Sequence, residues 1–230
     1  MTGEPLNATW LVILSVSVGS LVATLGAAML PRLREPDDSD DQKIPYAALG
    51  TPWFLTATGA CAAIGALVTV GLLGFPHALA LVGLGTLGVL LAAIDARTTY
   101  LPLSLTRAGW TLTALGVGAV AILARSWEPL AFGALGAAGL GGFFWLFWRF
   151  SSGIGFGDVR LAALIGAATG SIALRWTLWS AVLGSVIGVL LGLAWTWARR
   201  RRGVTASGFP YGPALVAGPY AALILLQVAG

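Results

Sequence analysis

One carboxylate follows a run of alternating glycines, in the stretch Gly153-Ile154-Gly155-Phe156-Gly157-Asp158. Glycine has no side chain and permits backbone angles that other residues avoid, so the run allows a second chain to approach closely. Asp158 directly precedes an apolar stretch. We therefore expect it in the first turn of a helix, where free backbone N–H groups tolerate negative charge. An acid in this position marks a candidate functional site.

A second carboxylate, Asp95, ends another apolar stretch. The other acids lie in the N-terminal tail, in one charged loop or in a turn at Glu128. Two carboxylates in a site of low dielectric constant do not ionise together, because repulsion and desolvation favour the neutral form of one. The charged carboxylate can take a proton from water while the neutral one protonates a substrate carbonyl, without metal or cofactor. Such a pair titrates as a unit, so neither residue is assigned as base or acid.

Spacing alone leaves other interpretations open. An aspartate at a helix start is often only a cap, and Asp95 could equally end a helix. Acids within a membrane also mark ion and proton paths, so a small proton-coupled transporter or channel-like protein is the alternative. A phosphate-binding loop is disfavoured, because the glycine run lacks the Gly-Lys-Ser/Thr ending and no strand precedes it.

The composition is that of a membrane protein. Of the 230 residues, 57% are hydrophobic and 10% are charged, against about 25% charged residues in soluble domains. Cys61 and His77 are the single cysteine and histidine, so we expect no cysteine-based zinc site and no metal centre. Arginine in cytoplasmic loops accounts for the net charge of +4 better than nucleic acid does. The expected partner is the lipid bilayer, with no nucleic acid.

Apolar stretches long enough to cross a bilayer, which takes roughly 20 residues, recur along the chain. We predict an all-α polytopic helical bundle in a single domain, residues 1–230, with about eight transmembrane helices. The predicted spans are Trp10–Leu30, Leu49–Leu73, Ala78–Ile94, Ala108–Leu123, Leu130–Phe147, Val159–Leu174, Trp176–Ala198 and Ala214–Val228.

The arginines and the lysine predict the orientation. Eleven of the 13 basic residues fall in the first, third, fifth and seventh loops, so these loops are expected in the cytoplasm and both termini outside. Asp95 and Asp158 then lie at one depth on the cytoplasmic side. The third and sixth spans hold few polar groups beyond Thr86 and Thr169. A proton path across the membrane would need more, which favours a peptidase.

Three motifs resemble those of the type IV prepilin peptidases, the membrane aspartic proteases with a GxGD motif. They are Ile94-Asp95 with Leu101-Pro102-Leu103-Ser104-Leu105-Thr106, the glycine run continued as Asp158-Val159-Arg160-Leu161, and Phe209-Pro210-Tyr211-Gly212-Pro213-Ala214-Leu215. The order of the motifs and the number of predicted spans also match. The first loop, between Gly19-Ser20 and Leu33-Arg34, loosely resembles the family's N-terminal region.

The resemblance implies an aspartic-type endopeptidase of the bacterial inner membrane that cleaves the leader peptide from prepilin-like proteins, type IV pilins or pseudopilins, at the cytoplasmic face. Asp95 and Asp158 would form the catalytic pair. Gly155 and Gly157 would let the substrate backbone approach, with Pro102 and Arg160 in substrate-binding or supporting roles. Pilus assembly, secretion and competence all remain open as the pathway.

The chain departs from the family pattern at Leu103, where an aspartate is usual, and at Arg160, which replaces a lysine and keeps its charge. Many members also N-methylate the new pilin terminus and carry an enlarged first loop with paired cysteines. This chain has a short first loop without cysteine. We therefore expect a short form without methyltransferase activity. S-adenosylmethionine would be a cofactor only if that activity were present, and peptide cleavage would need none.

Overall fold

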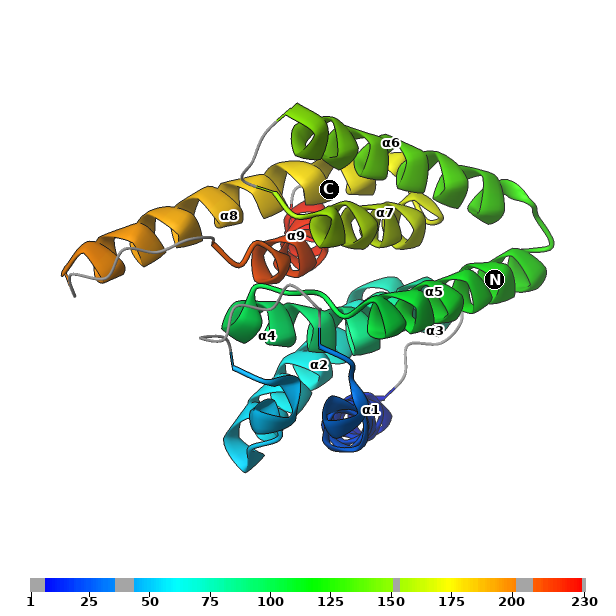
Figure 1. Cartoon of the computed structure of the whole chain (residues 1–230). Helices are drawn as coiled ribbons and strands as arrows, with labels where there is room; N and C mark the ends of the chain where they lie inside the picture. The colour runs from blue at the N-terminus through cyan, green and yellow to red at the C-terminus, as the bar shows by residue number, and fades with distance from the viewer. Residues whose placement is uncertain (1–6, 36–43, 151–153, 202–208, 229–230) are drawn as a thin grey trace.

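The computed structural model describes residues 7–35, 44–150, 154–201 and 209–228, and this part of the chain is helical, without strands (Figure 1). The prediction of an all-α fold is confirmed. The α-helices are α1 (Ala8–Met29), α2 (Pro52–Leu73), α3 (Phe75–Ala78), α4 (Val89–Thr98), α5 (Leu103–Ala124), α6 (Glu128–Phe150), α7 (Phe156–Gly170), α8 (Leu174–Arg201) and α9 (Gly212–Val228).

Fewer helices than the predicted eight have the length and composition of a membrane span. By length and composition, five helices of the described chain could cross a membrane: α1 with the turn that follows it, α2, α5, α6 and α8. A sixth span arises if the bent pair Phe75–Leu81 and Leu84–Thr98 crosses as one. Helices α7 and α9 occupy the positions of the other two predicted spans but have only 15 and 17 residues. The count of about eight is therefore not confirmed.

Three antiparallel helix pairs, α1–α2, α6–α7 and α8–α9, pack through glycines. A Cβ atom on Gly19 of α1 would lie 2.5 Å from the carbonyl oxygen of Gly59 in α2. Gly136 and Gly166 bring the backbones of α6 and α7 together in the same way, and Gly218 of α9 lies against the backbone of α8. Small residues allow helices to pack closely where lipid supplies no hydrophobic driving force.

The third predicted span is bent by 52° between Phe75–Leu81 and Leu84–Thr98. Its second part begins as a π-helix, Leu84–Gly88, which continues into α4. The bend occurs against α5, where a Cβ atom on Gly83 would lie 2.5 Å from the carbonyl oxygen of Gly109. Single π-helical turns are frequent at functional sites, and this one redirects the helix that carries Asp95.

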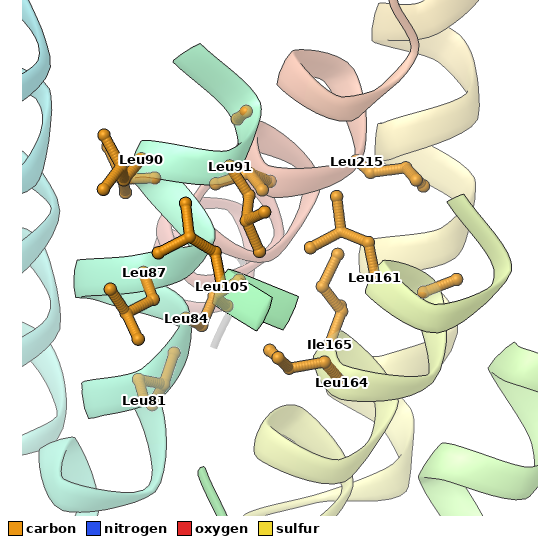
Figure 2. Close-up of a cluster of buried hydrophobic side chains, with 14 of the residues drawn as sticks. Leu81, Leu84, Leu87, Leu90, Leu91, Leu105, Leu161, Leu164, Ile165 and Leu215 are labelled. Carbon is orange, nitrogen blue, oxygen red and sulfur yellow. The ribbon is translucent and has the colours of Figure 1, made fainter. Parts of the chain in front are cut away.

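Leucine and isoleucine side chains from the bent span, α5, α7 and α9 meet in a common core (Figure 2). Leu91 of α4 and Leu161 of α7 are fully buried there, and Leu215 of α9 is 3% exposed. Leu91 precedes Asp95 by four residues and Leu161 follows Asp158 by three, so each is about one helical turn from an aspartate. Packing of this core therefore fixes the helix turns that carry both carboxylates.

Candidate active site

Asp95 is held by the start of the last helix. Its side chain is 4% exposed, and its Oδ2 accepts a hydrogen bond of 2.8 Å from the backbone N–H of Gly212. A Cβ atom on Gly212 would lie only 2.9 Å from that oxygen, so the contact requires glycine. The first N–H groups of a helix have no partner within the helix, and here one of them binds a carboxylate 117 residues earlier in the chain.

Sequence reasoning assigned Gly212 no place in the site, although it belongs to the C-terminal motif. The available signal was a glycine followed by Pro213 at the start of an apolar stretch. Such a pair marks a helix N-terminus with free amide donors and no side chain to shield them. The packing of α9 against α4 decides which carboxylate accepts a hydrogen bond from this amide, and the sequence alone does not show that packing.

The loop after Asp95 joins α4 to α5 and packs against the start of α7. Thr99 ends α4 in the left-handed conformation, with φ of 58°, and its N–H donates to the backbone carbonyl of Asp95. Pro102 begins α5, and its carbonyl accepts hydrogen bonds from both the N–H and the hydroxyl of Thr106. The side chain of Leu101, between these anchors, packs on Gly157, where a Cβ atom would lie 3.0 Å from it. The contact of Leu101 with Gly157 thus joins the two halves of the site, and Pro102 anchors the loop at the start of α5.

Asp158 is oriented by its own helix. It is the third residue of α7 and is 9% exposed, and its Oδ2 accepts a 3.1 Å hydrogen bond from the N–H of Gly155. The N–H of Asp158 donates back to the Gly155 carbonyl at 3.1 Å. Reciprocal bonds of this type close a helix N-terminus. Asp158 therefore lies in the first helical turn that the sequence predicts.

The two glycines of the motif differ in their surroundings. Gly155 is exposed, and its φ of −81° is open to any residue. A Cβ atom there would make only an ordinary 3.6 Å contact with Asp158. The missing side chain at Gly155 therefore leaves open space beside the carboxylate, whereas at Gly157 it makes room for Leu101. Gly153 lies outside the described residues.

The two carboxylates are close enough for Asp158 to repel Asp95 electrostatically. Asp158 lies outside the candidate membrane spans. Burial raises the pKa of Asp158 to about 6, and the hydrogen bond from Gly155 opposes this shift. A carboxyl that titrates close to neutral pH suits proton transfer.

Arg160 lies on the outer part of this helix start. Its guanidinium stacks over the ring of Phe156 at 4.6 Å, and that ring contacts Trp148 of α6 at 4.9 Å. The positive charge is thus held by an aromatic pair next to Asp158 in the chain. Cation–π contacts of this kind contribute about 0.5–1 kcal/mol at exposed positions.

The donor set is that of a carboxylate pair. In the residues that the structure describes, no three His, Cys, Asp or Glu side chains form a group that could hold a metal ion. Two carboxylates at one place can activate a water molecule and protonate a carbonyl oxygen.

Comparison with known proteins identifies relatives over most of the chain. The model of the type IV leader peptidase family matches residues 81–193, which include both aspartates. Two curated relatives, from Burkholderia pseudomallei strains 1026b and K96243, are named prepilin leader peptidase/N-methyltransferase. Each is 36% identical over 187 residues, covering 75% of this chain and 53% of the relative. The chain thus spans about half the length of these relatives. No solved structure matches it.

Proposed function

Because the chain belongs to the type IV leader peptidase family, we propose that it is a membrane aspartic endopeptidase that removes the leader peptide from prepilin-like proteins. The observation that carries this proposal is the pairing of Asp95 and Asp158. Both are buried, each accepts a hydrogen bond from a glycine N–H, and they interact electrostatically. The substrate would be cut at the cytoplasmic face of the bacterial inner membrane, where the distribution of basic residues puts both acids.

In the proposed mechanism a water molecule binds between the carboxylates. The ionised aspartate takes a proton from the water as its oxygen attacks the scissile carbonyl carbon, and the protonated aspartate donates to the carbonyl oxygen. The tetrahedral intermediate collapses when the leaving nitrogen receives a proton and the C–N bond breaks. The proton positions belong to the pair, so Asp95 and Asp158 share both roles.

The neighbouring residues support this chemistry. Gly155 leaves open space beside Asp158 in which an extended substrate backbone can lie, and Gly157 with Pro102 holds the connecting loop. We assign Arg160 a supporting role at the outer edge of the site, through its stacking on Phe156.

We propose the peptidase activity alone. The name of the relatives includes an N-methyltransferase activity, but this chain departs from the pattern of the methylating members. Its short first loop lacks the paired cysteines of methylating members; residues 36–43 of that loop lie outside the described residues. S-adenosylmethionine is therefore not assigned as a cofactor.

The test is cleavage of a co-expressed prepilin, scored by a gel shift. Wild-type protein should remove the leader, and Asp95→Asn and Asp158→Asn should each reduce cleavage by at least about a thousandfold, because both acids act as one unit. Glu128→Gln, which neutralises an exposed acid at the start of α6, should cleave normally.

Equal amounts of all four proteins in the membrane fraction would exclude misfolding as the cause. Cleavage that survives either aspartate substitution would contradict the mechanism. If the wild type leaves the prepilin uncut, the peptidase proposal itself fails.

A further inference from the structure

An open apolar groove of about 590 Å³ runs between α2, α4 and α9. Small and aliphatic side chains form its walls: Ala57, Cys61 and Ile64 from α2, Ala93 and Ala96 from α4, and Ala217 from α9. Alanine side chains in such walls let a helix backbone approach closely, as in helix pairs within membranes.

The groove passes beside the helix turn that carries Asp95, although neither aspartate is among its lining residues. Ala93 and Ala96 lie on the same turn of α4 as Asp95, and both line the groove. Pro213, another lining residue, directly follows Gly212, whose N–H binds Asp95. A chain cleaved beside Asp95 could therefore continue directly into the groove.

The length and chemistry of the groove fit a helix. Lining residues of α2 extend from Thr51 to Val68, a distance of about 25 Å at 1.5 Å per residue. At the end nearest Asp95 the lining includes the polar side chains of Thr51 and Arg97. Farther along, the only hydroxyl on the α2 wall, that of Thr58, already donates to the Phe54 carbonyl. Apart from the hydroxyls of Thr58 and Tyr220, the lining beyond this end is apolar.

We propose that this groove binds the apolar helix of the substrate that follows the scissile bond. This inference rests on the proposed peptidase function and adds the path of the substrate. The family resemblance implies a substrate whose leader is followed by a hydrophobic helix, so an apolar surface is needed where the leader ends. The groove of α2, α4 and α9 runs beside the turn of Asp95 and is lined mainly by apolar side chains. Lipid acyl chains are the competing occupant.

The native Cys61 provides the test, because it is the only cysteine of the chain and it is exposed in the groove. Single cysteines are placed at successive positions in the hydrophobic segment of a prepilin and oxidised in membranes with Asp158→Asn, which should retain the uncleaved precursor. We expect disulfide crosslinks to Cys61 that recur every three to four substrate positions, the period of a helix face.

The matched control is Asp158→Asn with Cys61→Ala and Ala60→Cys. Ala60 is the exposed neighbour on α2, at almost the same depth but outside the groove lining. Its crosslinking should be at least about fivefold weaker, since consecutive helix residues point about 100° apart. Equal crosslinking at both positions would show that the substrate helix does not select the groove, and no crosslink at Cys61 would indicate that lipid fills it; either result overturns the inference. Either result leaves wild-type cleavage intact. Failure of the groove proposal can therefore be told apart from failure of the proposed peptidase function.

A second variant tests the groove by filling it. Ala217→Trp places an indole in the groove wall, whereas Leu225→Trp changes a lipid-exposed position on the same helix. The first should reduce both the Cys61 crosslink and prepilin cleavage by about tenfold or more, with normal membrane abundance. The second should change neither. Equal cleavage by the two variants would count against substrate binding in the groove.

Discussion

The two aspartates are oriented by contacts of very different range. The bond to Asp158 comes from Gly155, three residues earlier, whereas the bond to Asp95 comes from Gly212, 117 residues later. The position of Asp158 therefore depends on the start of one helix. That of Asp95 depends on the packing of the bundle.

Burial of Asp158 should make the stability of the protein depend on pH. Its pKa is about 6 in the folded protein, against 3.8 for an ordinary aspartate, so the folded state binds the proton more tightly than the unfolded state. The contribution of this group to the free energy of unfolding is then greatest below about pH 4 and decreases as the pH rises to about 6. A shift of about two pKa units corresponds to a decrease of up to about 3 kcal/mol.

Thermal unfolding in detergent between pH 4 and 7.5 measures this effect. Asp158→Asn should reduce the dependence in this range, because the amide has no proton to release and only Asp95 of the pair still titrates. Glu128→Gln should retain the wild-type profile, since Glu128 is exposed. A profile for Asp158→Asn that matches the wild type would refute the assigned effect of burial.

At the scale of helices, glycines set the distances on which the site depends. Gly136 and Gly166 join α6 to α7, and Gly212 brings the start of α9 against α4. In Gly212→Ala the new Cβ would meet Asp95 Oδ2 at 2.9 Å and the Asp95 Cβ at 3.1 Å. The carboxylate would have to move, with loss of the hydrogen bond. A displacement of about 1 Å can cost about 100-fold in rate, and we expect cleavage to fall by about 10- to 100-fold.

Gly118→Ala is the control for this prediction, because a Cβ atom on Gly118 of α5 would meet nothing within 4 Å. It should leave prepilin cleavage unchanged and stabilise α5 by about 0.5–1 kcal/mol, since glycine is unfavourable inside a helix. Rates are compared at equal protein abundance in the gel-shift assay. Normal cleavage by Gly212→Ala would mean that the contact with α9 is dispensable for Asp95.

The positions of most helices could be predicted from hydropathy, because lipid-facing sides and buried sides are both apolar in such a bundle. The lengths of α7 and α9 were predicted to within two residues, but hydropathy could not decide whether helices this short cross the membrane. The bend at Gly83 and the π-helix at Leu84–Gly88 also escaped prediction. They depend on the close approach of the α5 backbone at Gly109, which no local pattern in the sequence records.

In the candidate site, the two acids could be predicted from the sequence, but the contacts that hold them could not. Asp95 and Asp158 could be selected because the chain has few acids and because both lie within recognisable motifs, and in the structure the charge of Asp158 acts on Asp95. Their catalytic role stays a prediction. The packing of Leu101 on Gly157 could not be foreseen, because it joins segments more than 50 residues apart whose relative position is set by the core in Figure 2.

For the whole molecule, the proposed orientation can be tested on a background with Cys61→Ala. Glu128→Cys and Arg201→Cys place single exposed cysteines at the start of α6 and at the end of α8. The excess of arginine in alternate loops predicts that the first is outside and the second is in the cytoplasm. A membrane-impermeant maleimide should label Glu128→Cys in intact spheroplasts and Arg201→Cys only after permeabilisation. The opposite pattern would place the carboxylates on the outer side.

The bond between Gly212 and Asp95 also bears on biosynthesis. A ribosome makes Asp95 first, Asp158 next and Gly212 last, so both acids are present in the nascent chain before the amide that orients one of them exists. The local bond at Asp158 can form as soon as α7 does. The site reaches its final arrangement only when α9 docks. Until then Asp95 lacks the amide that orients it.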